Sequence, residues 1–391
     1  MTDPDLIAAA RRVAPGLVAI RRTIHANPEL AFQEVKTAAL VTAQLRSLGI
    51  ETRTGVGRTG VIGVLRGGRP GRTIGVRADM DALPVTEATG LDFASQVPGA
   101  MHACGHDVHT VIALGVAELL AERRDSLPGT VKFLFQPAEE TLEGAPAMIA
   151  DGALEDPAMD AIIGFHNWPA LDADMVGYVP DVVLASSDAF DITLKGRAGH
   201  AAHPHTAIDA IVGAGHVVTL LQTIISREVA PVVPAVVTIG QIQGGTARNV
   251  IAGEVVLKGG VRALDAEASS QVEAAMRRIL DGACASLRLD YTLHYERKTP
   301  VLRNRPDILA TSLEAVRRAL GTDKVVQLPA PSMGSEDFAW FAERVPAAHL
   351  RIGGRVNGGG ALHMATFQCN EQAIPTGVVA VTAATLALLE E

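Results

Sequence analysis

The sequence has 391 residues, more than one hydrophobic core usually serves, so two domains are expected. Hydrophobic residues make up 48% and charged residues 20%, the balance of a globular protein, and the net charge of −9 argues against nucleic-acid binding and a basic membrane-facing surface. An odd set of three cysteines suits a reducing cytosol, and no signal peptide or membrane span is recognisable, so we expect a cytoplasmic protein.

The first part of the chain alternates predicted helices with short apolar strands. The pattern predicts helices over 6–25, 34–49 and 109–124, and strands over 60–67, 72–80, 129–140 and 161–169. Pro15 and Gly16 interrupt the first helix. Strands that alternate with helices favour a largely parallel sheet with helices on both faces.

Near residue 182 the pattern changes. The predicted elements are then a strand over 187–196, a helix over 206–226, strands over 232–245 and 253–263, a helix over 266–287 and a strand over 288–297. This β-α-β-β-α-β order is typical of an independent module of ferredoxin-like type. We therefore predict one α/β domain formed by residues 1–181 and 298–391, with the module of residues 182–297 inserted into it.

Polar side chains follow several predicted strands or lie in nearby loops. They are Asp79, Asp81, Cys104, His106, Glu139, Glu140, His166 and His363. A single histidine in such a loop is more often a surface or core residue, and paired glutamates are usually solvated. Ligands of open α/β sheets, however, bind at the carboxyl ends of strands, so we expect several of these donors to meet on one rim.

The stretch MHACGHDVHT places Cys104 and His106 two residues apart, where they can bind one metal ion or two adjacent ions. Histidine and carboxylate ligands at this density suit a transition metal such as zinc, manganese, cobalt or nickel. Two such ions roughly 3.5–4 Å apart would hold a bridging water and lower its pKa. A carboxylate without a metal bond is then needed to move protons, and two adjacent glutamates can divide these tasks.

Eight segments follow one another in the order of a known family. They are RRTIHANPELAFQE, VRADMDALPV, MHACGHDVHT, FQPAEET, FHNWP, GHAAHPH, TARNVIAG and MGSEDFAWF. Together they strongly resemble the M20 metallopeptidase family, in particular its amidohydrolase branch of hippurate hydrolases, N-acyl-L-amino acid amidohydrolases and auxin-conjugate hydrolases. The resemblance implies a di-metal hydrolase domain with an inserted lid and dimerisation domain. It also implies cleavage of N-acetyl or N-benzoyl amino acids to a carboxylic acid and a free amino acid.

The resemblance also assigns roles to residues. It implies that two divalent ions are bound by Cys104, His106, Glu140, His166 and His363. Glu139 would be the general base that acts on a metal-bridged hydroxide. Asp81 would orient one of the metal ligands without binding the metal itself. The peptidase branch has a histidine where this chain has Asp79, and Cys104 fills the gap, as in the amidohydrolase branch. Because a thiolate favours softer ions, the preferred metal stays open.

The inserted module resembles the family's lid and dimerisation domain, which implies a homodimer, or a tetramer. His200 matches a histidine that helps to hold the tetrahedral oxyanion, typically from the partner subunit. Asn249 and Arg262 match residues proposed to hold the substrate carboxylate, a task that suits the planar guanidinium of arginine. A solvated strand-end charge is the alternative for Arg262.

Other functions remain to be weighed against the amidohydrolase. A dipeptidase or aminopeptidase of the same family would need a carboxylate near the substrate's amino group, whereas an acylase needs an apolar acyl pocket. An inactive, dimeric binding relative would have lost Glu139 or a ligand, yet every one of these positions carries a competent side chain. Cys104 as a nucleophile with His106 as its base would leave the glutamates and the other histidines unexplained.

Overall fold

The computed structural model describes residues 3–391, and this part of the chain divides into two compact units. The large unit contains the described residues up to Val183, together with Arg303–Ala330 and Asp337–Glu391. The small unit contains Leu184–Leu302 and Pro331–Glu336. The sequence predicted that residues 331–336 belong to the large domain, but they belong to the small unit. The Ala185 N–H donates to the carbonyl oxygens of Ser332 and Gly334 and so attaches this segment to the small unit.

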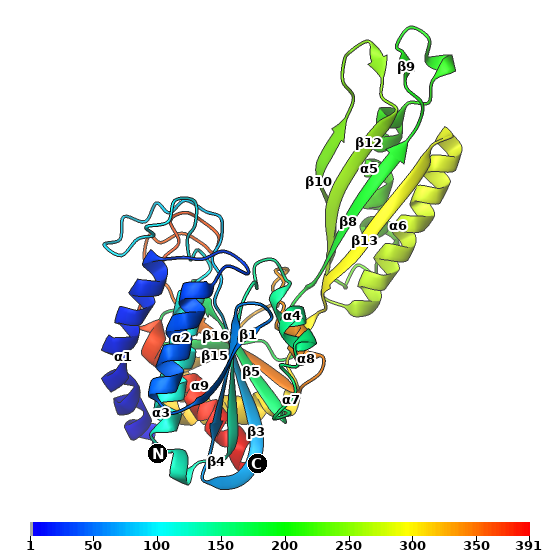
Figure 1. The fold of residues 1–391 in the computed structure, drawn as a ribbon. Helices are drawn as coiled ribbons and strands as arrows, with labels where there is room; N and C mark the ends of the chain where they lie inside the picture. Colours follow the sequence, from blue (N-terminus) through cyan, green and yellow to red (C-terminus); the bar gives the residue numbers. More distant parts are fainter. Residues whose placement is uncertain (1–2) are drawn as a thin grey trace. The chain divides into compact units, whose positions relative to one another are not determined.

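The large unit is built on one eight-stranded sheet, whose strands run in the order β1-β2-β4-β3-β5-β16-β6-β15 (Figure 1). Their bounds are β1 Glu51–Val56, β2 Gly60–Arg66, β3 Arg69–Asp79, β4 Pro128–Gln136, β5 Ala161–Trp168, β6 Val176–Tyr178, β15 Val325–Gln327 and β16 Ala347–Gly353. The central strands β4, β3, β5 and β16 are mutually parallel, whereas β1 and β2 add an antiparallel edge. The predicted α/β class with a largely parallel sheet is confirmed.

Helices cover this sheet. They are α1 Asp3–Ala26, α2 Val35–Ser47, α3 His106–Ala121, α4 Gly144–Ala150, α7 Pro306–Leu320, α8 Ala339–Ala342 and α9 Ala373–Glu390, with short 3₁₀ turns at Arg124–Ser126 and Thr322–Lys324. Helices α3 and α9 pack on the central strands, and α1 packs on helices α3 and α9. Helix α1 continues through the exposed Pro15 because buried side chains on its other face, such as Leu17 and Ile24, hold it against its neighbours.

The small unit has the predicted β-α-β-β-α-β order. Its main elements are β8 Ser186–Lys195, α5 Ala210–Thr223, β10 Ala235–Gly244, β12 Glu254–Ala263, α6 Ala266–Leu287 and β13 Asp290–Thr299. The sheet order β10-β12-β8-β13 is that of a ferredoxin-like fold, and α5 and α6 pack on the sheet around their own hydrophobic core. The minor elements are β7 Val182–Leu184, β9 Gly199–His200, β11 Val250–Ile251, β14 Leu302–Arg303, a 3₁₀ turn at Pro204–Thr206 and a π turn at Ile224–Glu228.

Two helical segments, Ala210–Glu228 and α9, are long and apolar enough by composition to cross a bilayer. Helix α9 is almost wholly buried in the large unit, and the apolar face of α5 that carries Val217 and Leu221 packs on the small unit's sheet. Core helices of globular proteins have this composition, so neither segment supports a membrane-spanning role.

Candidate metal centre

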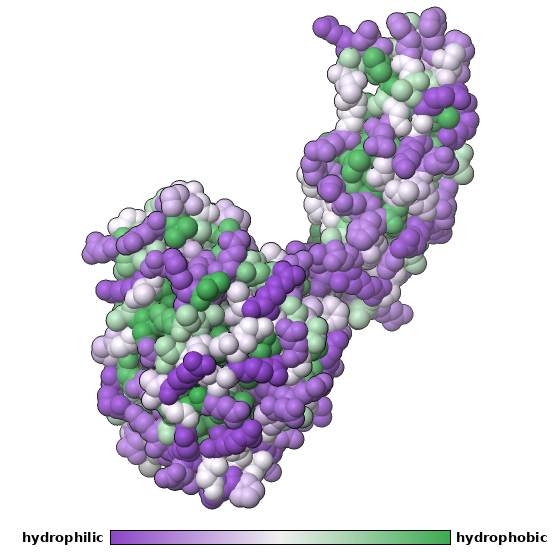
Figure 2. Space-filling model, in the orientation of Figure 1, coloured by the Kyte–Doolittle hydropathy of each residue, from purple (hydrophilic) through white to green (hydrophobic). Residues whose placement is uncertain are grey.

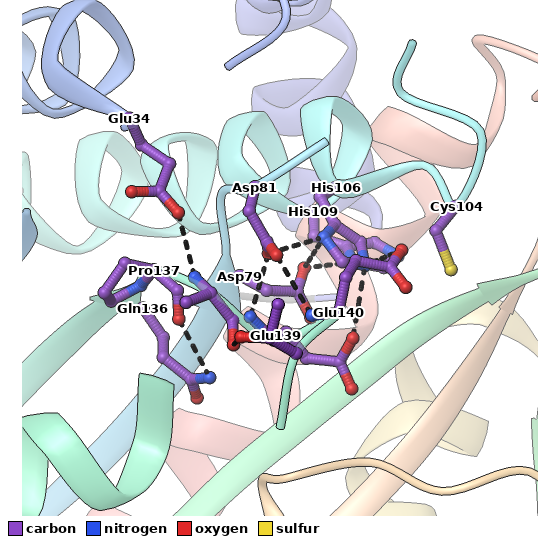
Figure 3. Close-up of polar contacts among 12 residues, drawn as sticks. Glu34, Asp79, Asp81, Cys104, His106, His109, Gln136, Pro137, Glu139 and Glu140 are labelled. Carbon is purple, nitrogen blue, oxygen red and sulfur yellow. Dashed lines mark hydrogen bonds and ion pairs between the residues drawn. The ribbon is translucent and has the colours of Figure 1, made fainter. Parts of the chain in front are cut away.

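Donor side chains from three parallel strands and one helix meet at the carboxyl edge of the large sheet (Figure 3). Asp79 is the last residue of β3, Glu139 and Glu140 follow the end of β4, His166 lies near the end of β5, and His106 begins α3. The crossover connections of a parallel sheet bring these strand ends to one rim, as expected from their positions in the sequence. His363 reaches the same place from the loop between β16 and α9, where its backbone N–H donates to the Ala103 carbonyl oxygen.

The five predicted ligands come together in two overlapping groups. In the first group, Cys104, His106 and His166, the Cys104 sulfur lies 3.3 Å from His166 Nε2. In the second group, Cys104, Glu140 and His363, His363 Nε2 lies 3.5 Å from a Glu140 oxygen. Because the two groups overlap at Cys104, these residues would be able to hold two neighbouring ions.

Two buried atoms in this centre lack hydrogen-bond partners among the described residues. They are His106 Nε2 and Glu140 Oε1, and 3.7 Å separates them. This distance is too long for a hydrogen bond, but it is reasonable for donors to two neighbouring cations. A buried polar atom without a partner is costly, and bound divalent ions would satisfy both atoms. The side chains therefore fit a metal centre.

Hydrogen bonds behind the centre fix the imidazole orientations. His106 Nδ1 donates to the buried carboxylate of Asp81 at 3.2 Å, and His166 Nδ1 donates to the Asn167 carbonyl oxygen at 2.7 Å. Because Nδ1 is bonded in this way, Nε2 of each ring faces the other donors, and its lone pair can bind a metal once Nε2 carries no proton. Asp81 thus lies where a residue that orients a metal ligand is expected.

The electrostatics of the centre favour a cation. Burial and the negative charge of Glu140 raise the pKa of the Cys104 thiol, and burial raises the pKa of Glu140 to about 7. Burial opposes protonation of His106, but Asp79 and the hydrogen bond to Asp81 outweigh it and raise the pKa of this imidazole. Without a cation, Cys104, Glu140 and His106 therefore all tend to hold protons, and metal binding would displace these protons.

Asp79 is held by its own network. One of its oxygens accepts from Arg77 Nη1 and the other from His109 Nδ1, each at 2.6 Å, and all three residues are fully buried. His109 Nε2 in turn accepts from the Asn167 N–H at 2.7 Å, which fixes this ring beside His106 and His166. Arg77 and His109 were given no role from the sequence, although both stand in the quoted segments.

Glu139 is buried beside these donors, with Oε2 3.9 Å from His106 Nε2. Its backbone N–H donates to Asp81 Oδ1, and the N–H of Glu140 donates to Asp81 Oδ2, each at 3.0 Å. Asp81 therefore orients His106 and also fixes the backbone of both glutamates. The two glutamate side chains leave this backbone beside the same group of donors (Figure 3).

The remaining predicted residues belong to the small unit. His200 in β9 is exposed, and its Nδ1 accepts from the Ala202 N–H at 3.1 Å, so the ring proton is on Nε2. Asn249 is its neighbour, because the Ala201 N–H donates to the Asn249 carbonyl oxygen at 3.0 Å. Arg262, whose guanidinium donates to the Ser335 hydroxyl, lies toward the other end of β12.

Asn249 and Arg262 are consequently far apart within one chain. The β9–β11 pair adjoins the Glu254 end of β12, and Arg262 lies eight residues further along this strand. At about 3.3 Å per residue, the separation along β12 is roughly 26 Å. One small unit therefore cannot use both residues to hold one carboxylate.

Comparison with known proteins places this geometry among enzymes. Residues 75–387 match the model of peptidase family M20/M25/M40. A Synechocystis sp. protein named as a probable hydrolase is 43% identical to this chain, and the match covers 96% of each chain. The N-acetyl-L-cysteine deacetylase of Bacillus subtilis is 39% identical, and the match covers 92% of this chain and 84% of the deacetylase. A Bacillus subtilis protein described as a dinuclear metal-binding peptidase of the M20 family has a TM-score of 0.85 and 36% identity, with 97% of this chain and 99% of that chain covered.

Proposed function

The chain belongs to peptidase family M20/M25/M40 and is an amidohydrolase with a dinuclear metal centre, and we propose that its substrates are N-acyl amino acids. Hydrolysis of the amide bond would release a carboxylic acid and a free amino acid. The observation that carries the proposal is the group of sulfur, imidazole and carboxylate donors, buried except for the exposed His363, beside the buried carboxylate of Glu139. The deacetylase relative supports an acyl group as small as acetyl.

Five residues would hold the two ions: Cys104, His106, Glu140, His166 and His363. Bound divalent ions lower the pKa of a water molecule and polarise the carbonyl group that it attacks. Asp81 keeps the His106 ring in the ligating tautomer and holds the glutamate backbone in place. Imidazole and carboxylate ligands suit zinc, manganese, cobalt or nickel, and the thiolate favours the softer of these ions.

Glu139 would move the protons of the reaction. Its carboxylate would take a proton from the attacking water and give it to the nitrogen of the leaving amino acid. Its position supports this role, because it is adjacent in sequence to the proposed ligand Glu140 and its Oε2 lies 3.9 Å from His106 Nε2. The fixed backbone of Glu139 would keep the base aimed at the reacting atoms.

We propose roles in catalysis and substrate binding for two residues of the small unit. His200 would donate its Nε2 proton to the developing oxyanion, and Arg262 would bind the substrate carboxylate. Because His200 and Asn249 lie at the opposite end of β12 from Arg262, the two ends would serve one substrate only if they come from different copies of the chain. This geometry supports a homodimer in which each subunit contributes to its partner's site.

The surface of the small unit supports association of this kind. Most of the exposed large hydrophobic side chains among the described residues belong to it, and they are scattered among polar ones (Figure 2). They include Ile211, Val212 and Leu220 on α5, and Val236 and Ile242 on β10. Since β10 is an edge strand of the four-stranded sheet, a second copy could pair with it.

Three buried cysteines that form no disulfide suit our further proposal that the protein works in the cytoplasm.

Substrate hydrolysis tests the proposal directly. The protein, loaded in turn with zinc, manganese, cobalt or nickel, would be assayed with hippurate, a set of N-acetyl amino acids and a set of dipeptides. We expect the N-acyl amino acids to be hydrolysed with higher kcat/KM than the dipeptides. Faster hydrolysis of dipeptides would replace the proposal with a dipeptidase activity, and a complete lack of hydrolysis in every metal form would contradict an enzymatic role for this centre.

Removing the metals should abolish activity and lower stability together. Ions that bind only the folded state stabilise it by about 2.7 kcal/mol at 100 times their dissociation constant, and the centre joins segments from across the large unit. We expect dialysis against a chelator to lower Tm, measured by calorimetry, and added zinc or manganese to restore both Tm and turnover. If chelation leaves turnover intact while alkylation of Cys104 abolishes it, the thiol would be the nucleophile.

Substitution of Arg262 should affect binding of the substrate carboxylate. A lost hydrogen bond between charged groups costs roughly 1.5–3 kcal/mol, so we expect Arg262→Ala to lower kcat/KM by about 10- to 150-fold, mainly through KM. The matched control is the amide of the same substrate, whose hydrolysis should change little because it lacks the carboxylate. An equal loss on both substrates would mean that Arg262 acts through folding or packing.

A further inference from the structure

Glu34 is a buried carboxylate close to the centre that has no place among the proposed ligands or proton carriers. It ends the quoted segment RRTIHANPELAFQE and immediately precedes α2. Its Oε1 accepts from the backbone N–H groups of Phe32 and Ala138, each at 2.9 Å, and its Oε2 accepts from the Thr59 hydroxyl at 2.5 Å. Both oxygens are therefore engaged, and one of them reaches the loop that follows β4.

That loop carries the glutamate pair. Three successive backbone N–H groups, those of Ala138, Glu139 and Glu140, donate to Glu34 Oε1, Asp81 Oδ1 and Asp81 Oδ2 respectively. In Figure 3, Glu34 and Asp81 lie on the same side of this loop, each joined to it by dashed lines. Two buried carboxylates thus hold three consecutive amides, and the side chains of the proposed base and the proposed ligand start from the last two.

The conformation of Ala138 explains why the loop needs such a partner. Ala138 has φ 52°, in the left-handed region that a residue with a Cβ atom rarely adopts. Backbone strain of this kind persists only where surrounding contacts hold it. The Glu34 carboxylate binds the N–H of this same residue, so it opposes relaxation of the turn that sets the direction of Glu139 and Glu140.

We propose that Glu34 is a positioning residue for the glutamate pair: by binding the Ala138 N–H, it holds Glu139 and Glu140 in their productive directions. The inference rests on the proposed hydrolysis, and it adds a residue that contacts neither substrate nor ions. The Thr59 hydroxyl, from the turn between β1 and β2, orients the Glu34 carboxylate for this task. Loss of Glu34 should therefore reduce the chemical step more than substrate binding.

Glu29 offers a matched control from the same segment. Its carboxylate accepts from the backbone N–H groups of Lys36 and Thr37 and from the Thr37 hydroxyl, and so it binds the first turn of α2. Glu29 and Glu34 each bind two backbone N–H groups and one hydroxyl. Only the Glu34 carboxylate binds the loop of the glutamate pair, so the comparison separates positioning from general stabilisation.

The experiment compares Glu34→Leu, Glu34→Gln and Glu29→Leu in the metal-loaded enzyme, with kcat, KM, Tm and metal content measured for each. We expect Glu34→Leu to lower kcat on the order of 100-fold, with a small change in KM, because misplacement by about 1 Å can have this effect. Glu34→Gln should recover most of kcat, since its amide oxygen can still accept from Ala138. Glu29→Leu should lower Tm while leaving kcat near the wild-type value.

Three results would overturn the proposal: wild-type kcat in Glu34→Leu, no recovery in Glu34→Gln, or an equal loss of kcat in Glu29→Leu. If Glu34→Leu does not fold, Thr59→Val removes the hydroxyl that orients Glu34 and should give a smaller fall in kcat with unchanged metal content; an unchanged kcat would count against the proposal. If the wild-type protein hydrolyses none of the substrates, the proposed function fails separately. Crystal structures then decide, because an unmoved loop at residues 137–140 in the variant would contradict positioning by Glu34.

Discussion

Replacing Glu139 with glutamine should remove nearly all turnover while both ions stay bound. Glutamine keeps the size of the side chain and leaves the backbone N–H bonded to Asp81, but it cannot accept a proton at neutral pH. General acid–base catalysis contributes roughly 100- to 10,000-fold, so we expect kcat to fall by about that factor with KM little changed. Steady-state kinetics, together with elemental analysis of the bound metal, measures both parts of this expectation.

Glu140→Gln is the matched control, since it makes the same chemical change one residue along the chain. Glu140 lies 3.5 Å from His363 Nε2 and 3.7 Å from His106 Nε2, so its loss should lower metal content as well as turnover. High metal with low turnover in Glu139→Gln, and low metal in Glu140→Gln, would divide the roles as proposed. Near-normal turnover in Glu139→Gln would remove its assignment as the base.

Much of the large unit and of its centre could be predicted because local signals and strand topology agree. Short apolar strands alternating with helices predicted a parallel sheet, and a parallel sheet brings its strand ends to one edge. That rule is sufficient to unite residues at or just beyond the ends of β3, β4 and β5, although they are far apart in the sequence. His363 lies in an irregular loop with a positive φ of 68°, so strand topology could not place it; it was one polar candidate among several, and the family resemblance gave it the role of a ligand.

The residues that sequence reasoning missed act through contacts that no spacing reveals. Glu34 and Ala138 are 104 positions apart, and Arg77 and Asp337 are 260 apart, yet each pair forms a buried hydrogen bond. Polar side chains in such networks interrupt the hydrophobic periodicity on which helix and strand predictions depend. The separation of Asn249 from Arg262, in contrast, follows from the extended length of β12, and the predicted strand over 253–263 already contained this signal.

Replacing His200 with alanine should lower turnover strongly without loss of metal. The Ala202 N–H fills the Nδ1 acceptor of this ring, which leaves an Nε2–H that can donate to a developing oxyanion. Removing a donor of this kind costs roughly 100- to 1,000-fold in kcat, and the exposed ring makes no contribution to the buried core of the small unit. A lower metal content in His200→Ala would mean that this histidine takes part in metal binding instead.

A mixture of two inactive variants tests whether His200 serves its own subunit or the partner. In a dimer of His200→Ala with Glu139→Gln, one site combines an intact Glu139 from the first chain with an intact His200 from the second, provided that His200 crosses between subunits. Random exchange would then restore about a quarter of the wild-type sites, because half of the dimers are mixed and each has one competent site. If His200 acted within its own chain, every site would lack either His200 or Glu139, as in the parent variants. Mixing would then restore no intact site. Recovery of activity on mixing therefore requires a site assembled from two copies, the arrangement that also unites Asn249 with Arg262.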